Sequence, residues 1–196
     1  APSAPGAFDA PDAAMEAALS WRSALVPGTV ADSFDTDLET AFDCDAEDWW
    51  YRCAFERPSA SPGEAHRLRF DGLATLAEVW LNGTRLFGSR NMFVPRVCDT
   101  PGLLAGRNEL VICFRSVKAE CAKKKPRPRW KTALVSHQNL RWIRATLLGR
   151  IPAWTPAIPP VGPWKTSVLE TRRLADPTRL DLQTGAKGSE GRISLD

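Results

Sequence analysis

The residue types that most often perform chemistry are sparse in this chain of 196 residues. Ser136 and His137 are neighbours, but a serine nucleophile and its histidine base cannot be adjacent on a strand, because successive side chains point to opposite faces. No Gly-x-Ser-x-Gly motif surrounds Ser136. The only other histidine, His66, has no ligand motif beside it, and no phosphate-binding glycine loop occurs. The sequence therefore predicts neither a serine nor a zinc centre, and no cofactor.

Five cysteines offer a second kind of chemistry. An odd number cannot all pair within one chain, and none forms a Cys-x-x-Cys unit of the kind found in zinc or redox sites. Two of them, Cys53 and Cys113, lie within apolar, strand-like patterns. We expect small buried hydrophobic residues in a reducing compartment, the cytoplasm, with disulfides and a secreted or periplasmic location as the open alternative. The five are Cys44, Cys53, Cys98, Cys113 and Cys121.

Charge is unevenly distributed along the chain. The net charge is +3, but residues 1–48 are strongly acidic and residues 118–131 hold a basic cluster. Such a cluster can bind phosphates, whereas aromatic residues are not interleaved with it as a single-strand platform requires. A solvated loop with an acidic partner in the same chain is therefore favoured over nucleic-acid binding. No apolar run reaches the ~18 residues that cross a bilayer, so no membrane partner is expected.

The candidate groups must be held by β-strands, because no long helical pattern occurs and short apolar runs alternate with turn residues. Asn82-Gly83 supplies the two positive-φ residues of a type I′ hairpin. Apolar residues on both faces of 108–115 predict a strand buried from both sides. Many short strands favour an all-β double-sheet sandwich. The expected strands are 49–55, 66–71, 76–81, 84–87, 94–98, 108–115, 130–136 and 164–170.

The remaining segments define the expected domains. Residues 1–14 are rich in Ala, Pro and Asp and predict a flexible leader before a domain at 15–170. Residues 138–148 suit either a short helix or an irregular crossing segment. Residues 171–196 contain one hairpin, which is marginal alone in water. We therefore expect this end to be the start of a truncated, immunoglobulin-like second β-sandwich.

Seven motifs occur in an order that resembles the N-terminal sugar-binding domain of glycoside hydrolase family 2, in particular its beta-mannosidase branch. The resemblance covers residues 16–170 and implies a galactose-binding-domain-like jelly roll that packs against a catalytic barrel of the same polypeptide. The two carboxylates of a retaining glycosidase lie on that barrel, which needs ~250 residues, so no residue here is expected to be catalytic. The motifs are Pro27-Gly28-Thr29, Trp50-Tyr51-Arg52, Phe70–Leu73, Glu78–Gly83, Asn91–Phe93, Gly106–Leu110 and Val161–Glu170.

The resemblance also suggests substrate-binding residues. In mannosidases a Trp-Asp-Trp-Gly-Pro segment reaches the sugar; the matching segment here is Pro152-Ala153-Trp154-Thr155-Pro156. Ala153 replaces the carboxylate, which leaves mannose specificity open. Trp154 either stacks on a sugar ring or anchors the loop by packing. Asn91 and Arg144 are further candidates, with a turn hydrogen bond and an internal ion pair as their structural alternatives.

The sequence thus predicts a non-catalytic scaffold that binds carbohydrate only as part of a larger active site. A stand-alone carbohydrate-binding module is the main alternative, and a basic interaction domain is a weaker one. Trp49, Trp50 and Trp80 are expected to pack in the core.

Overall fold

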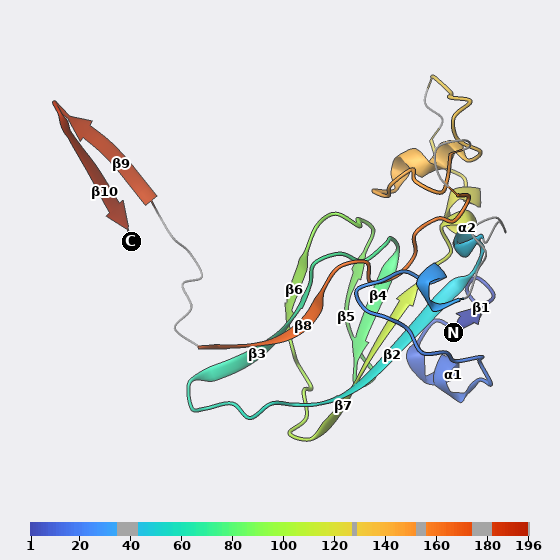
Figure 1. Cartoon of the computed structure of the whole chain (residues 1–196), viewed down its shortest axis with the longest axis horizontal. Coiled ribbons are helices and arrows are strands. Elements are labelled where there is room, and N and C mark those ends of the chain that lie inside the picture. Colours follow the sequence, from blue (N-terminus) through green and yellow to red (C-terminus); the bar gives the residue numbers. More distant parts are fainter. Residues whose placement is uncertain (35–42, 127–128, 152–155, 174–181, 196) are drawn as a thin grey trace.

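The computed structural model describes residues 1–34, 43–126, 129–151, 156–173 and 182–195. Its main body is a sandwich of two antiparallel sheets, which confirms the expected all-β class (Figure 1). The five-stranded sheet has the order β1-β2-β7-β4-β5 and consists of Pro2–Ser3, Asp48–Glu56, Arg107–Phe114, Ala77–Leu81 and Thr84–Ser89. The three-stranded sheet has the order β6-β3-β8 and consists of Arg96–Asp99, Glu64–Phe70 and Ser167–Arg173.

Local sequence explains the centre of the five-stranded sheet. Asn82 and Gly83 have φ angles of 49° and 78°, and they join β4 to β5 with Leu81 opposite Thr84. This is the two-residue hairpin expected from Asn-Gly. β7 pairs with both β2 and β4, so its strand lies between two neighbours.

Each face of the five-stranded sheet has its own core. Between the sheets, side chains from β4 and β7 meet those of β3, including Leu68, Phe70 and Phe114, which are at most 3% exposed. On the outer face Trp50 and Trp80 stack with ring centroids 5.8 Å apart. They and Trp49 are buried, as expected. The outer core comprises Ala14, Trp50, Trp80, Val111 and Cys113, with Phe8, Met15, Leu19 and Trp21 packed against it.

The first residues differ from the expected flexible leader. β1 pairs with β2 through Pro2 and Ser3, and helix α1 (Pro11–Glu16) buries Ala14 completely. The reason lies in tertiary contacts: the apolar outer face of the sheet needs a cover, and the residues around α1 supply it. Their composition alone gave no sign of this.

Residues 130–136 form no strand, which corrects a second expectation. The Thr132 N–H donates to Gln138 Oε1 at 3.1 Å, and Gln138 Nε2 donates to the Thr132 carbonyl at 2.7 Å. The side chain of Gln138, the first residue of η3 (Gln138–Trp142), thus satisfies both backbone groups of Thr132, so neither takes part in a sheet ladder. η3 is one short 3₁₀ turn followed by irregular backbone, which agrees with the crossing-segment alternative for 138–148.

The other short elements lie around the sandwich or after it. Helix α2 (Val117–Ala122) follows β7, and two 3₁₀ turns, η1 (Ala31–Ser33) and η2 (Cys44–Ala46), precede β2. Strands β9 (Leu182–Lys187) and β10 (Glu190–Leu195) form a separate two-stranded hairpin, in which Leu182 is 59% and Ile193 70% exposed. The expected hairpin is present, and its place in a second sandwich stays a prediction. None of the described helices is long and apolar enough to cross a membrane.

Candidate functional site

Asn91 and Arg144, two of the predicted site residues, lie side by side at one end of the sandwich. They form an isolated parallel β-bridge. The Met92 N–H donates to the Arg144 carbonyl at 3.0 Å, and the Arg144 N–H donates to the Arg90 carbonyl at 3.4 Å. The fold therefore joins two segments that are distant in sequence.

The side chains of the two residues have different roles. Asn91 Oδ1 accepts a hydrogen bond from the Phe93 N–H at 3.0 Å, which is the turn role that the sequence left open. The Arg144 side chain is exposed and makes no ion pair with any residue in the described ranges, so the expected internal pair is not observed. Arg144 is thus the one of the two that presents its polar group to solvent.

Met92 anchors this bridge to the sandwich. It is 3% exposed, its carbonyl accepts from Trp164 Nε1 at 3.0 Å, and its sulfur lies 3.0 Å from the Thr146 nitrogen. The Trp164 indole lies so close to Gly72 that a Cβ there would stand 2.6 Å from Nε1, so only glycine fits. Three motifs that are far apart in sequence therefore meet at one point.

A buried ion pair fixes the segment that follows Arg144. Arg150 Nε and Nη2 each lie 2.6 Å from an oxygen of Asp45, a bidentate pair whose side chains are 3% and 11% exposed. Arg150 Nη1 also donates to the Thr146 carbonyl at 2.9 Å. The pair joins η2 to residues 146–150. The two partners are 105 residues apart, and no local sequence pattern connects them.

The two segments that the bridge joins carry several exposed apolar side chains. Five of them, each between 44% and 52% exposed, belong to residues 91–94 and 142–148, the two segments that the bridge joins. We call this set the apolar rim: Phe93, Val94, Trp142, Leu147 and Leu148. The third predicted site residue, Trp154, lies outside the described residues together with Ala153. The structure therefore brings Asn91 and Arg144 together and leaves Trp154 unplaced.

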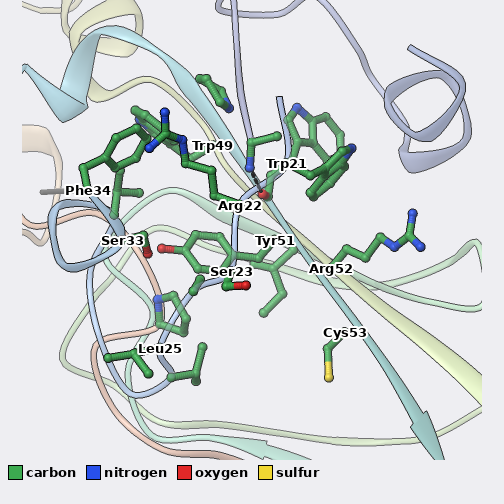
Figure 2. A pocket seen from close by; sticks show the side chains of 18 of the residues that line it. Trp21, Arg22, Ser23, Leu25, Ser33, Phe34, Trp49, Tyr51, Arg52 and Cys53 are labelled. Atoms are coloured by element: carbon green, nitrogen blue, oxygen red, sulfur yellow. Dashed lines mark hydrogen bonds between the residues drawn. The ribbon is translucent and has the colours of Figure 1, made fainter. Parts of the chain in front are cut away.

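A cavity of about 620 Å³ lies elsewhere, beside β2 (Figure 2). Its walls include Trp21, Arg22, Phe34 and Tyr51. Cys53 also lines it and is exposed, which corrects the expected burial of this thiol. The strand itself was predicted, but β1 pairs only with the start of β2, so Cys53 lies at an uncovered edge.

The basic cluster is partly neutralised within the chain. Lys118 Nζ lies 2.8 Å from Asp43, and Lys123 and Lys125 lie 2.7 and 2.9 Å from Glu120. Arg90 also contacts Glu120. An acidic partner in the same chain was expected, and several of these cations have one.

The buried thiols are held in their unreactive, protonated form. Burial raises the pKa of the Cys44 thiol to about 12 and that of Cys121 to about 11, so both stay protonated at neutral pH. Burial likewise raises the pKa of Cys113. No group of three or more His, Cys, Asp or Glu side chains in the described part of the chain could hold a metal ion.

Comparison with known proteins gives consistent matches. A family model described as glycosyl hydrolase 2 galactose-binding domain-like matches residues 20–165. Beta-mannosidase B of Thermothelomyces thermophilus is 37% identical over 142 residues, which cover 65% of this chain and 16% of that protein. Beta-mannosidase B of Aspergillus terreus is 30% identical over 135 residues, and this match also covers 65% of this chain and 16% of that protein.

One solved structure shows the same fold. The beta-D-mannosidase from Dictyoglomus thermophilum superposes with a TM-score of 0.69 at 22% identity, over 90% of this chain and 23% of that one. The matched segment spans 16% of the length of the curated relatives.

Proposed function

Because the chain belongs to the glycosyl hydrolase 2 galactose-binding domain-like family, we propose that it serves a beta-mannosidase-like glycoside hydrolase as a non-catalytic domain that supports and shapes the sugar pocket. The matched relatives are named beta-mannosidases, and most of their length lies beyond the matched segment. The activity on O-glycosyl bonds is assigned to that further part, the expected catalytic barrel.

The apolar rim is the observation that carries this proposal. Its five side chains are half-exposed although they lie around a rigid point, where Met92, Trp164 and the Arg150–Asp45 pair fix the backbone. Apolar surface on a rigid support is typical of a surface that another domain covers. The occupant we propose is the catalytic domain of the same polypeptide.

Arg144 lies in one of the two segments that carry the rim, and it is exposed. At the border between two domains its guanidinium can donate hydrogen bonds to sugar hydroxyls or to a carboxylate of the partner domain. Trp154 is proposed to stack on the sugar. The proposed substrate is a hexoside. Its sugar is not specified, because Ala153 carries no carboxylate at the position where mannosidases have one. A cytoplasmic location is part of the proposal.

A chimera tests this function. Residues 20–165 of this chain replace the matched segment of the Thermothelomyces thermophilus relative, and kcat/KM is measured with an aryl β-D-mannoside. We expect turnover by the chimera and none by the present chain alone. A folded chimera without turnover would contradict the proposal.

A pair of leucine variants identifies the rim as the contact surface. Leu147→Ser with Leu148→Ser in the chimera should lower kcat/KM about 30-fold or more, because each exchange removes roughly 1–2 kcal/mol of apolar burial. Leu104→Ser is the matched control, since Leu104 is 54% exposed and lies outside the rim. Equal activity of the rim variant and the control would refute the docking surface.

A further inference from the structure

The cavity beside β2 is open because that strand lacks a neighbour. β1 pairs only with Asp48 and Trp49, so in the described part of the chain β2 has no strand partner on that side from Tyr51 onward. Residues 20–26 pass along this edge and line the outer side of the cavity (Figure 2). The backbone groups of an unpaired edge are available donors and acceptors.

Two serine hydroxyls in the cavity wall are buried and have no hydrogen-bond partner among the described residues. Ser33 Oγ comes from η1 and Ser167 Oγ comes from β8, and both residues line the cavity. A buried hydroxyl without a partner costs about 1–3 kcal/mol, so such groups are rare unless a ligand or water satisfies them. Figure 2 shows the Tyr51 hydroxyl directed to the same side as Ser33.

Aromatic rings and two arginines form much of the remaining wall. Phe34 and Trp49 pack edge to face at 5.7 Å, and the Arg22 guanidinium lies 4.7 Å from the centroid of the Phe34 ring. Arg52, also in the wall, pairs with Glu109 at 3.3 Å. Aromatic faces beside free hydroxyls suit a ring that is apolar on one side and hydroxylated on the other. A volume of about 620 Å³ is ordinary for a small-molecule site.

We propose that this cavity binds a neutral, hydroxylated ring compound with an apolar substituent, of the size of an aryl hexoside. Its hydroxyls hydrogen-bond with Ser33 and Ser167, and its apolar group packs against Phe34 and Tyr51. The site goes beyond the proposed function, because no residue of the apolar rim lines the cavity. Failure of one proposal therefore leaves the other intact.

Protection of Cys53 from alkylation measures binding directly. Cys53 is exposed and lines the cavity, whereas Cys98 is half-buried, lies outside it and serves as an internal control on the same molecule. With phenyl β-D-glucopyranoside as the probe, we expect slower iodoacetamide labelling of Cys53, read by peptide mass, with a dissociation constant of about 1 mM. Labelling of Cys98 should not change.

Two half-probes separate the contributions of the ligand's parts. Phenol and methyl β-D-glucopyranoside should each bind about tenfold more weakly or worse, since each lacks one of the two kinds of contact. Binding of the phenyl glucoside should be the same at low salt and in 0.5 M NaCl, because the ligand carries no charge. Protection by phenol alone that equals that of the glycoside would overturn the proposal.

Alanine variants of the two serines test the contacts themselves. Ser33→Ala with Ser167→Ala removes buried hydroxyls that have no hydrogen-bond partner among the described residues, so the melting temperature should stay the same or rise while the glycoside binds about tenfold more weakly. Ser59→Ala, in the exposed loop after β2, is the matched control and should bind like the parent. Equal affinity of the double variant, or no protection of Cys53 at 50 mM glycoside, would mean that the cavity holds water only and would refute the site.

Discussion

The Arg150–Asp45 pair is the contact on which the proposed sugar-pocket end depends most. Arg150→Met keeps the apolar stem of the side chain but removes the guanidinium that binds Asp45 with two contacts of 2.6 Å. The Asp45 carboxylate, 11% exposed, then loses the one ion-pair partner that it has among the described residues. The hydrogen bond to the Thr146 carbonyl is lost as well.

Burial sets the size of the effect. Removing one partner of a buried ion pair costs about 3–5 kcal/mol, mostly because the other charge stays desolvated. For a chain of this length we expect a fall in melting temperature of roughly 8–16 °C. The double variant Asp45→Leu with Arg150→Met should recover most of this loss, because neither charge then remains buried.

Urea unfolding of the parent, both single variants and the double variant gives the coupling energy of the pair. Arg52→Met is the control, since the Arg52–Glu109 pair is 46% and 41% exposed and should contribute less than about 1 kcal/mol. If Arg150→Met costs no more than this control, the pair does not fix residues 146–150, and the rigid support proposed for the rim is refuted.

Two further predictions concern charge and backbone. Burial raises the pKa of Glu120, but hydrogen bonds from two lysines and an arginine outweigh it and lower this pKa to about 2 from 4.5. The stability gained from this carboxylate is present above pH 4.5 and is lost as the pH falls towards 2. In Glu120→Gln the urea midpoint should therefore depend less on pH between 4.5 and 2 than it does in the parent. The same pH dependence in both proteins would contradict the network. Gly149 has φ +74°, and a Cβ there would collide with the Ile158 carbonyl, so Gly149→Ala should destabilise by about 2 kcal/mol or more. Gly63→Ala is the control, because there only the positive φ is strained, and a loss of about 1 kcal/mol of stability is expected. Equal losses of stability for the two variants in thermal unfolding would refute the collision at Gly149.

The strands were largely predictable because their cause is local. The alternation in 76–81, the continuous apolar run in 108–115 and the Asn82-Gly83 turn each lie within a few residues, and the observed register follows them. Residues 130–136 have the same β-forming composition, but the Gln138 side chain, and not a neighbouring strand, forms the hydrogen bonds with the Thr132 backbone. Composition therefore could not distinguish a strand from a side-chain-capped loop.

The candidate site was less predictable because its contacts are long-range. The motifs around Asn91 and Trp164 were visible in the sequence, but their meeting at the Met92 carbonyl was not. Cys53 shows the reverse case: its strand was predicted, whereas its exposure depends on where β1 ends. The cavity beside it left no sequence signal at all.

The central position of β7 determines how the molecule opens. Its backbone pairs with β2 on one side and β4 on the other, and residues 111–114 are at most 5% exposed. No local fluctuation can expose these amides without separating two strand pairs and both cores, so their hydrogen exchange should proceed only through global unfolding. The β9–β10 hairpin has exposed apolar side chains on its two strands, and its amides should exchange at rates independent of the sandwich.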